Sequence, residues 1–231
     1  MKVFGSMAVQ PAVEVLLPAF EKDTGLHPAI EWNTAPTLVK RLQAGEAADV
    51  VILNRATMDI VQREGRILAG SEVTLASSPA SIAVKAGAPR PDLSTAEALR
   101  RTLLAARAIS YSNPAAGGAS GIHFAKVIEQ MGIADAVNAK NRFPPAGGLT
   151  ARFLPTGEVE LAIQQTPELL QVSGIEIVGP LPAPYQLVTV FVAGIEKSSA
   201  KAAEAKSFVD FLRTPKAIET FRANGLDPAR S

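Results

Sequence analysis

Cysteine is absent from this 231-residue chain, and the chain holds only two histidines and few aromatic residues. The lack of cysteine excludes disulfides, thiolate catalysis and cysteine-based metal sites. His27 and His123 lie far apart in the sequence, which argues against a zinc site. Aromatics make up 5% and the formal net charge is +1, so the basic, stacking surface that nucleic acids require is missing. We therefore expect no metal, no cofactor and no nucleic-acid partner.

The sequence also lacks long apolar runs. No stretch approaches the roughly 18 apolar residues that span a bilayer, so we expect no membrane insertion. The opening residues, MKVFGSMAV, do not show the basic, apolar and small-residue segments of a secretory signal. We expect a monomer that is periplasmic if an export signal precedes Met1 and cytoplasmic otherwise.

Strand and helix patterns alternate along the chain. Apolar residues make up 47% and charged residues 19%, which is typical of a compact chain with one large domain or two small ones. The alternation predicts an α/β fold with parallel or mixed sheets. Strands are predicted over 2–4, 27–32, 49–53, 81–84, 108–110, 161–164, 176–178 and 187–192. Helices are predicted over 10–24, 56–64, 95–106, 149–154, 167–172, 200–212 and 215–224. Another helix is opened by residues 33–37 and runs to residue 44, and a further one follows Ser120.

The segment SYSNPAAGGASGIHF contains the strongest local signal. Gly117, Gly118, Ala119, Ser120 and Gly121 precede an amphipathic helix whose apolar residues recur at helical spacing. Glycines let backbone N–H groups point outward, and a helix N-terminus adds positive potential, so the segment suits a small anion. The alternative is that Ser120 is an ordinary N-cap with no ligand.

Small polar residues recur at four predicted strand-to-helix junctions. In open α/β sheets ligands collect at the carboxyl ends of the strands. Each junction is also explained by helix capping alone, but together they favour a shared, neutral anion site. The junctions are Gly5–Ser6, Asn33–Thr34, Asn113 to Ser120, and Gly147 to Thr150.

The order of these motifs resembles a known family. The segments are GSMAVQPAVEVLLPAFEKDTG, NTAPTLVKRLQAGEAADVVIL, SNPAAGGASGIHFAKVIEQMGI, GEVELAIQQTPELL, VGPLP and AEAKSFVDFLRTPKAIETFRANGLDPA. Together they look like the molybdate-binding branch of the type II periplasmic solute-binding proteins. Each motif is weak by itself, but their order and spacing over nearly the whole chain are fairly specific.

The resemblance implies two α/β lobes joined by crossover strands that close over a ligand. One lobe would comprise 1–80 plus 193–231 and the other 81–187, with crossovers near 78–85 and 186–192. Carried over position by position, the donors to the oxyanion would be Ser6, Thr34, Gly118, Ala119 or Ser120, and Leu149 or Thr150.

Three departures from the family pattern shift the expected ligand. Gln165 stands where molybdate binders commonly place a tyrosine, and Arg55 stands where small residues are usual. The segment from Gly117 to His123 also differs from the usual Pro–Gly–x–Ala pattern. A guanidinium group grips planar carboxylates in bidentate fashion. These changes favour a small organic acid over molybdate, and relatives with a similar glycine–serine–histidine segment resemble aconitate isomerase.

The roles of two residues, Arg55 and His123, have alternative interpretations. Arg55 is either a ligand clamp or a surface arginine beside Asp59, four residues further on. His123 is either a capping or packing residue, or an acid–base group in the cleft.

The sequence favours one function and leaves a second as the alternative. One is the substrate-binding protein of an ABC-type transporter, which captures a small anion and is recognised by the membrane subunit. The other is an isomerase that moves a proton within an unsaturated tricarboxylate, with His123 as its base. The sequence is compatible both with an enzyme and with a binding protein that performs no chemistry.

Overall fold

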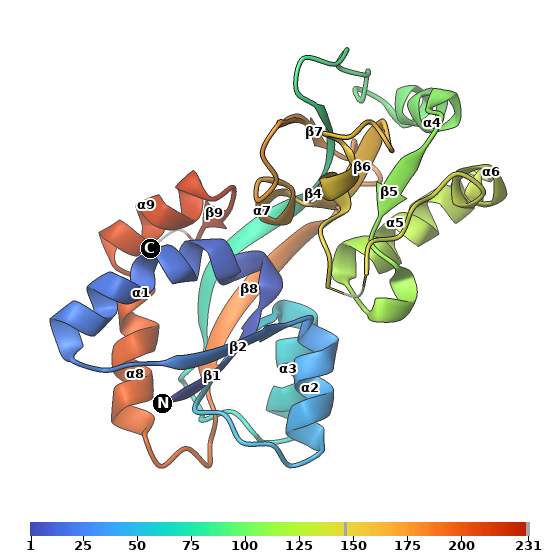
Figure 1. Ribbon diagram of the computed structural model, residues 1–231. Coiled ribbons are helices and arrows are strands. Elements are labelled where there is room, and N and C mark those ends of the chain that lie inside the picture. The colour runs from blue at the N-terminus through green and yellow to red at the C-terminus, as the bar shows by residue number, and fades with distance from the viewer. Residues whose placement is uncertain (146, 230–231) are drawn as a thin grey trace. The chain divides into compact units, whose positions relative to one another are not determined.

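The computed structural model describes residues 1–145 and 147–229, and these form two compact units. Unit 1 comprises Met1–Ser78 and Thr189–Ser231, and unit 2 comprises Pro79–Val188. Two long strands, β4 (Val73–Lys85) and β8 (Val188–Ile195), each contain residues of both units. Figure 1 shows both strands passing between the units. No described helix is long and apolar enough to cross a membrane.

Unit 1 is built on a mixed sheet in the order β2-β1-β3-β8-β4. β1 pairs in parallel with β2 and β3, whereas β8 runs antiparallel to β3. A short strand, β9, pairs with the first half of β4. The bounds are β1 Lys2–Ser6, β2 Ala29–Asn33, β3 Val50–Asn54, β9 Asp227–Pro228, α1 Gln10–Thr24, α2 Ala35–Gln43, α3 Arg55–Arg63, α8 Ala202–Phe211 and α9 Pro215–Ala223.

Side chains that alternate along the strands of unit 1 enter two separate cores. Val3 and Ile52 pack with α1, α8 and α9 on one face of the sheet. Phe4 and Val51 pack with α2 and α3 on the other face. Both faces are therefore covered by helices, as a buried parallel sheet requires.

Unit 2 has the sheet order β7-β4-β6-β5, in which only β5 and β6 are parallel. One core lies under α4, α5 and α6, and a smaller one lies under the 3-10 helix η3 and α7. The bounds are β5 Ile109–Tyr111, β6 Leu161–Gln165, β7 Ile175–Pro180, α4 Ala96–Ala105, α5 Ala119–Gln130, α6 Ala134–Asn138, α7 Thr166–Leu169 and η3 Thr150–Phe153.

The predicted α/β class is confirmed, and most element positions agree with the prediction. α1 begins and ends where expected. It ends there because Gly25 takes the left-handed conformation, with a φ of 70°, that stops the helix.

Three local predictions were wrong. β4 begins eight residues before predicted residue 81, α7 is shorter than 167–172, and 149–154 contains a 3-10 helix. Residue 146, in the predicted turn-rich stretch 142–148, lies outside the described residues.

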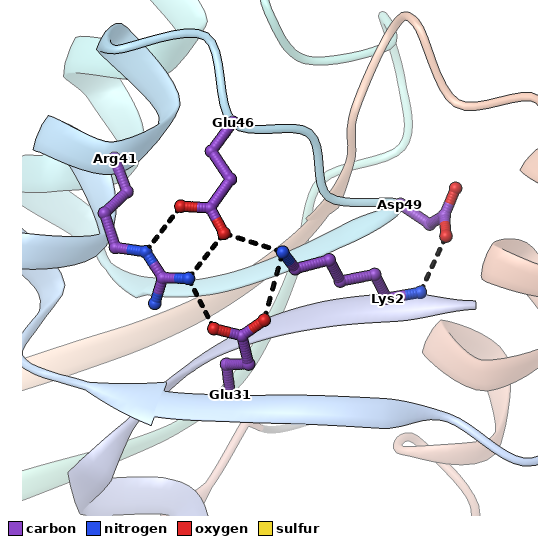
Figure 2. Close-up of polar contacts among 5 residues, drawn as sticks. All are labelled: Lys2, Glu31, Arg41, Glu46 and Asp49. Carbon is purple, nitrogen blue, oxygen red and sulfur yellow. Dashed lines mark hydrogen bonds and ion pairs between the residues drawn. The ribbon is translucent and has the colours of Figure 1, made fainter.

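A network of charged side chains ties α2 and its following loop to the sheet of unit 1 (Figure 2). The Lys2 Nζ lies 2.7 Å from the Glu46 Oε1 and 3.0 Å from the Glu31 Oε1. The Arg41 Nε donates to the Glu46 Oε2 at 2.7 Å, and the Arg41 Nη2 also bonds Glu31. At the sheet end, the Lys2 backbone N–H donates to the Asp49 carboxylate at 2.7 Å. Two cations thus share two carboxylates, which anchors the helix whose N-cap is Thr34.

The network makes the stability of unit 1 sensitive to acid. Hydrogen bonds from Arg41 and then Lys2 hold the pKa of Glu46 at about 2 and that of Glu31 below its ordinary value. Because both carboxyl pKa values are lowered in the folded state, their contribution is complete above the unfolded value of 4.5. It is lost as the pH falls through the folded values.

We therefore expect Arg41→Met to lower the Tm at neutral pH, and the difference from the parent to shrink as the pH is lowered towards about 2. Differential scanning calorimetry over this pH range measures both effects. Lys206→Met is the matched control, since Lys206 forms a single exposed pair with Asp210. Equal losses of Tm in the two variants, or a loss independent of pH, would contradict this role of the network.

Candidate functional site

In unit 1, three of the predicted site residues lie at the carboxyl edge of the sheet. Ser6 ends β1, and its register partner on β2 is Asn33, which precedes Thr34. Arg55 directly follows β3, which is parallel to β1. Parallel pairing therefore brings Ser6, Thr34 and the Arg55 backbone to the same edge.

The two hydroxyl residues of this edge differ in their local bonds. Ser6 is buried and is the N-cap residue of the 3-10 helix η1 (Met7–Val9), but its side chain makes no capping hydrogen bond. The Thr34 backbone N–H donates to the Asn33 Oδ1 at 2.8 Å, and its hydroxyl lies 2.8 Å from the Thr37 hydroxyl. The hydroxyl groups of Ser6 and Thr34 are therefore the candidates at this edge for donating hydrogen bonds to an anion.

The Arg55 side chain is engaged within unit 1. Its Nη1 lies 2.8 Å from the Glu72 Oε2 and 3.7 Å from the Asp59 Oδ1, and its Nη2 donates to the Thr74 hydroxyl at 3.4 Å. The ion pair with Asp59 is the one that the sequence spacing suggested. Glu72 is the stronger partner, and it comes close only through the fold. A ligand carboxylate would have to compete with Glu72 for this guanidinium group.

In unit 2, the N-terminus of α5 lies beside the carboxyl ends of β5 and β6. Gly118 is the N-cap and no side chain caps the helix, so Ser120 is not the cap that one interpretation predicted. The first intrahelical bond runs from Ile122 to the Gly118 carbonyl. The N–H groups of Ala119, Ser120 and Gly121 consequently have no partner within the helix, and they carry the positive end of a 12-residue helix.

Gly121 allows this helix end to approach the strand that precedes it. A Cβ atom at residue 121 would lie only 2.3 Å from the backbone oxygen of Ser112. At Gly118 a Cβ atom would meet nothing nearer than the Ser112 Cβ at 3.9 Å. The absence of a side chain at Gly121 therefore sets the position of the first turn of α5.

Thr150, Gln164 and Gln165 surround the end of β6. The fully buried Thr150 donates through its backbone N–H and its hydroxyl to the Gln164 Oε1, at 2.8 and 3.0 Å. The Gln164 Nε2 in turn donates to the Gly148 carbonyl at 3.3 Å. Gln165 is the N-cap of α7 and forms a capping box with Glu168. Thr150 thus supports the site through Gln164, since both of its donors are used internally.

His123 faces the segment between β7 and β8. Its Nε2 lies 2.8 Å from the backbone oxygen of Tyr185. A carbonyl oxygen only accepts, so Nε2 carries the hydrogen, and the neutral ring keeps its lone pair on Nδ1. His123 therefore joins α5 to the Tyr185 segment and retains one nitrogen for acid–base work.

Sequence reasoning missed Gln164 and Glu168. Burial raises the pKa of the Glu168 carboxyl to about 7, against hydrogen bonds from the Gln165 backbone and the Gln164 side chain that lower it. The signal for Glu168 was present in the sequence, because Gln165 and Glu168 have the spacing of a capping box. Gln164 has no comparable signal.

A cavity of unit 2 lies away from these residues. It has a volume of about 470 Å³ and includes Val84, Lys85, Arg107, Glu160 and Leu161 in its lining. Leu161 begins β6, so this cavity opens at the opposite end of the strand from Gln165. It does not belong to the candidate site. No group of three or more histidine, aspartate or glutamate residues suited to a metal ion occurs among residues 1–145 and 147–229.

Comparison with known proteins identifies the family of this chain. The family described as "Bacterial extracellular solute-binding protein" matches residues 1–227, so the chain belongs to this solute-binding family. Two curated relatives extend the comparison. An aconitate isomerase from a Pseudomonas species is 30% identical over 99% of this chain and 87% of its own length. The molybdate-binding protein ModA of Escherichia coli K12 is 23% identical over 96% of this chain and 87% of its own.

Solved structures support the same fold. The periplasmic molybdate-binding protein of Azotobacter vinelandii superposes with a TM-score of 0.76 at 22% identity, covering 100% of both chains. The substrate-binding domain of a putative molybdenum ABC transporter from Clostridium difficile gives a TM-score of 0.78 at 12% identity, covering 100% of this chain and 99% of that one. The predicted type II periplasmic-binding-protein fold and family are thereby confirmed.

The close approach at Gly121 gives a direct test of the site's construction. We expect Gly121→Ala to lower the free energy of unfolding by about 1–3 kcal/mol, because the added methyl group collides with backbone that must move. Gly118→Ala is the matched control and should change it by less than about 1 kcal/mol, since the methyl group has room there. Urea denaturation followed by circular dichroism measures both values. Similar losses in the two variants would show that Gly121 does not set the position of α5.

Proposed function

We propose that this chain binds a small organic acid anion through neutral donors at the carboxyl ends of its strands. The observation that carries the proposal is the N-terminus of α5, whose first N–H groups have no intrahelical partner and whose position depends on Gly121. Ala119, Ser120 and Gly121 supply the backbone donors in unit 2, with Gly118 at the N-cap of α5 and Gln165 at the end of β6. Ser6 and Thr34 are the proposed donors of unit 1.

A carboxylate is favoured over molybdate for two reasons. The aconitate isomerase relative is more similar to this chain than ModA is, at 30% against 23% identity. The departures of the sequence from the molybdate-binding pattern also favour a carboxylate, because Gln165 stands where molybdate binders commonly place a tyrosine. Arg55 is a secondary donor in this proposal, because it would have to leave Glu72 first.

The family supports a proposed partner and a proposed location for this chain. Solute-binding proteins present captured ligands to a transporter, so an ABC-type membrane subunit is the proposed partner of this chain. The family description, bacterial extracellular, supports a location outside the cytoplasmic membrane. In this role the protein captures its anion without changing it.

A panel of anions tests the ligand class. Citrate and the two aconitates should raise the Tm, whereas molybdate, tungstate, sulfate and phosphate should not. A ligand at about 100 times its Kd adds about 2.7 kcal/mol to the free energy of unfolding, which a thermal-shift assay detects readily. Stabilisation by micromolar molybdate or tungstate with none by the carboxylates would contradict the carboxylate assignment and favour an oxyanion.

A second candidate function is isomerisation of an unsaturated tricarboxylate. The 30% identical relative, an aconitate isomerase, favours it, and so does the Nδ1 lone pair of His123. In such a reaction a base removes a proton from the methylene carbon, the double bond shifts, and a proton is returned to the other carbon. His123 would be the base, and the α5 N-terminus would stabilise the charge that develops on the carboxylate.

Incubation with cis- or trans-aconitate in deuterated water separates the two candidates. A binding protein returns the same isomer without deuterium. An isomerase forms the other isomer with solvent deuterium incorporated, and His123→Gln should then reduce turnover by about 10²–10⁴ while leaving binding largely intact. Chromatography and mass spectrometry measure both readouts. Full turnover in His123→Gln would exclude this histidine as the base.

A further inference from the structure

A cavity of unit 2 lies at the end of β6 opposite the proposed anion site. Its lining comes from the end of β4, the C-terminal end of α4, and the segment that joins η3 to β6. All of these residues belong to one compact unit. The volume of about 470 Å³ falls within the range of about 300–1,000 Å³ that is typical of small-molecule sites.

The buried part of this lining is apolar. Val84, Leu154 and Leu161 line the cavity, and each is at most 4% exposed. Towards the surface the lining includes small residues such as Ala88 and Ala105, whose side chains leave the space open. A molecule that enters the cavity therefore places an apolar group against apolar side chains, which favours binding by removing apolar surface from water.

Hydrogen bonds fix the loop that forms one wall of the cavity. At its start, the Gly87 backbone N–H donates to the Glu176 Oε1 at 3.0 Å. At its end, the hydroxyl of Thr102, a lining residue on α4, donates to the Asp92 carbonyl at 3.1 Å. Pro89 lies between these two bonds and restricts the backbone further. The wall is thus held in place with no ligand present.

The charges that line the cavity do not balance. They belong to two cations, Lys85 and Arg107, and one anion, Glu160. The Arg107 Nε donates to the Glu160 Oε1 at 2.6 Å, and the Arg107 backbone N–H donates to the Glu160 Oε2 at 2.8 Å, so both carboxylate oxygens are used. Lys85 is exposed and forms no ion pair with any residue that the structure describes. Its ammonium group is therefore the charge available to a ligand.

We propose that this cavity is a second ligand site, which binds a small amphipathic carboxylate. The apolar chain of the ligand lies against Val84, Leu154 and Leu161, and its carboxylate pairs with Lys85. A polycarboxylate suits this cavity poorly, because an apolar lining leaves its further charges without partners. The two sites of unit 2 consequently select anions of different kinds.

Octanoate is the probe for this site, with the ¹⁵N-labelled full chain observed by NMR. The backbone amides of Val84, Ala106 and Leu161 should shift together with one Kd. The amides of Ala119 and Gly121, at the proposed anion site, should not shift with that Kd. The location of the shifts thereby separates this site from the proposed anion site, whatever ligand the latter takes.

Two variants test the two parts of the ligand. Ala105→Trp places an indole ring at the exposed side of the cavity and should weaken octanoate at least about tenfold, which corresponds to losing about two buried methylene groups. Lys85→Gln should weaken octanoate about two- to fivefold, as expected for an exposed charge pair, and leave 1-octanol unchanged. Lys126→Gln is the matched control, since Lys126 is also exposed and without an ion pair among the described residues of unit 2.

Three results would overturn the proposal. Millimolar octanoate that leaves the amides of Val84, Ala106 and Leu161 unmoved would show that the cavity binds no such ligand. Equal octanoate affinity in the wild type and in folded Ala105→Trp would show the same. Octanoate affinity that is unchanged in Lys85→Gln, or that falls no more than in Lys126→Gln, would overturn the carboxylate assignment, and this comparison does not depend on whether Ala105→Trp folds.

Discussion

Parallel strand pairing is the constraint on which the rest of this structure depends. β1 pairs in parallel with β2 and β3, and β5 pairs in parallel with β6, so in each unit the carboxyl ends of neighbouring strands meet at one edge. Residues far apart in the sequence, such as Ser6 and Thr34 or Ala119 and Gln165, reach these edges for that reason. The cores on both sheet faces then hold the helices whose N-termini begin there.

Neutral groups dominate the donors at these edges. The α5 N-terminus supplies backbone N–H groups, and the hydroxyls of Ser6 and Thr34 add to them. The cation that sequence reasoning added, Arg55, is paired with Glu72. An anion would thus be bound mainly by oriented dipoles.

Local signals in the sequence predicted the elements, and the resemblance to solute-binding proteins predicted the fold. The bounds of α1 were predicted because an apolar periodicity runs up to Gly25, which stops the helix. The first half of β4 was missed because Ser77, Ser78 and Pro79 interrupt its apolar pattern, and pairing with β9 and the neighbouring strands supplies what local propensity lacks.

Side-chain contacts were less predictable than the elements that carry them. The junction that holds Arg55 was found, but Glu72 lies 17 residues away and approaches only through the fold. Ser120 was weighed as a cap, whereas Gly118 takes that position because Gly121 must contact Ser112 closely. Thr150 was expected to face the ligand, and the structure shows its donors on Gln164, a residue without any sequence signal.

The central claim is that the first turn of α5 receives the anion. Titration of the ¹⁵N-labelled protein with trans-aconitate, followed by NMR, tests it most directly. The account predicts that the backbone amides of Ala119, Ser120 and Gly121 shift together, with one Kd, to positions typical of N–H groups bonded to a carboxylate. Saturable binding that leaves these three amides unmoved would contradict it.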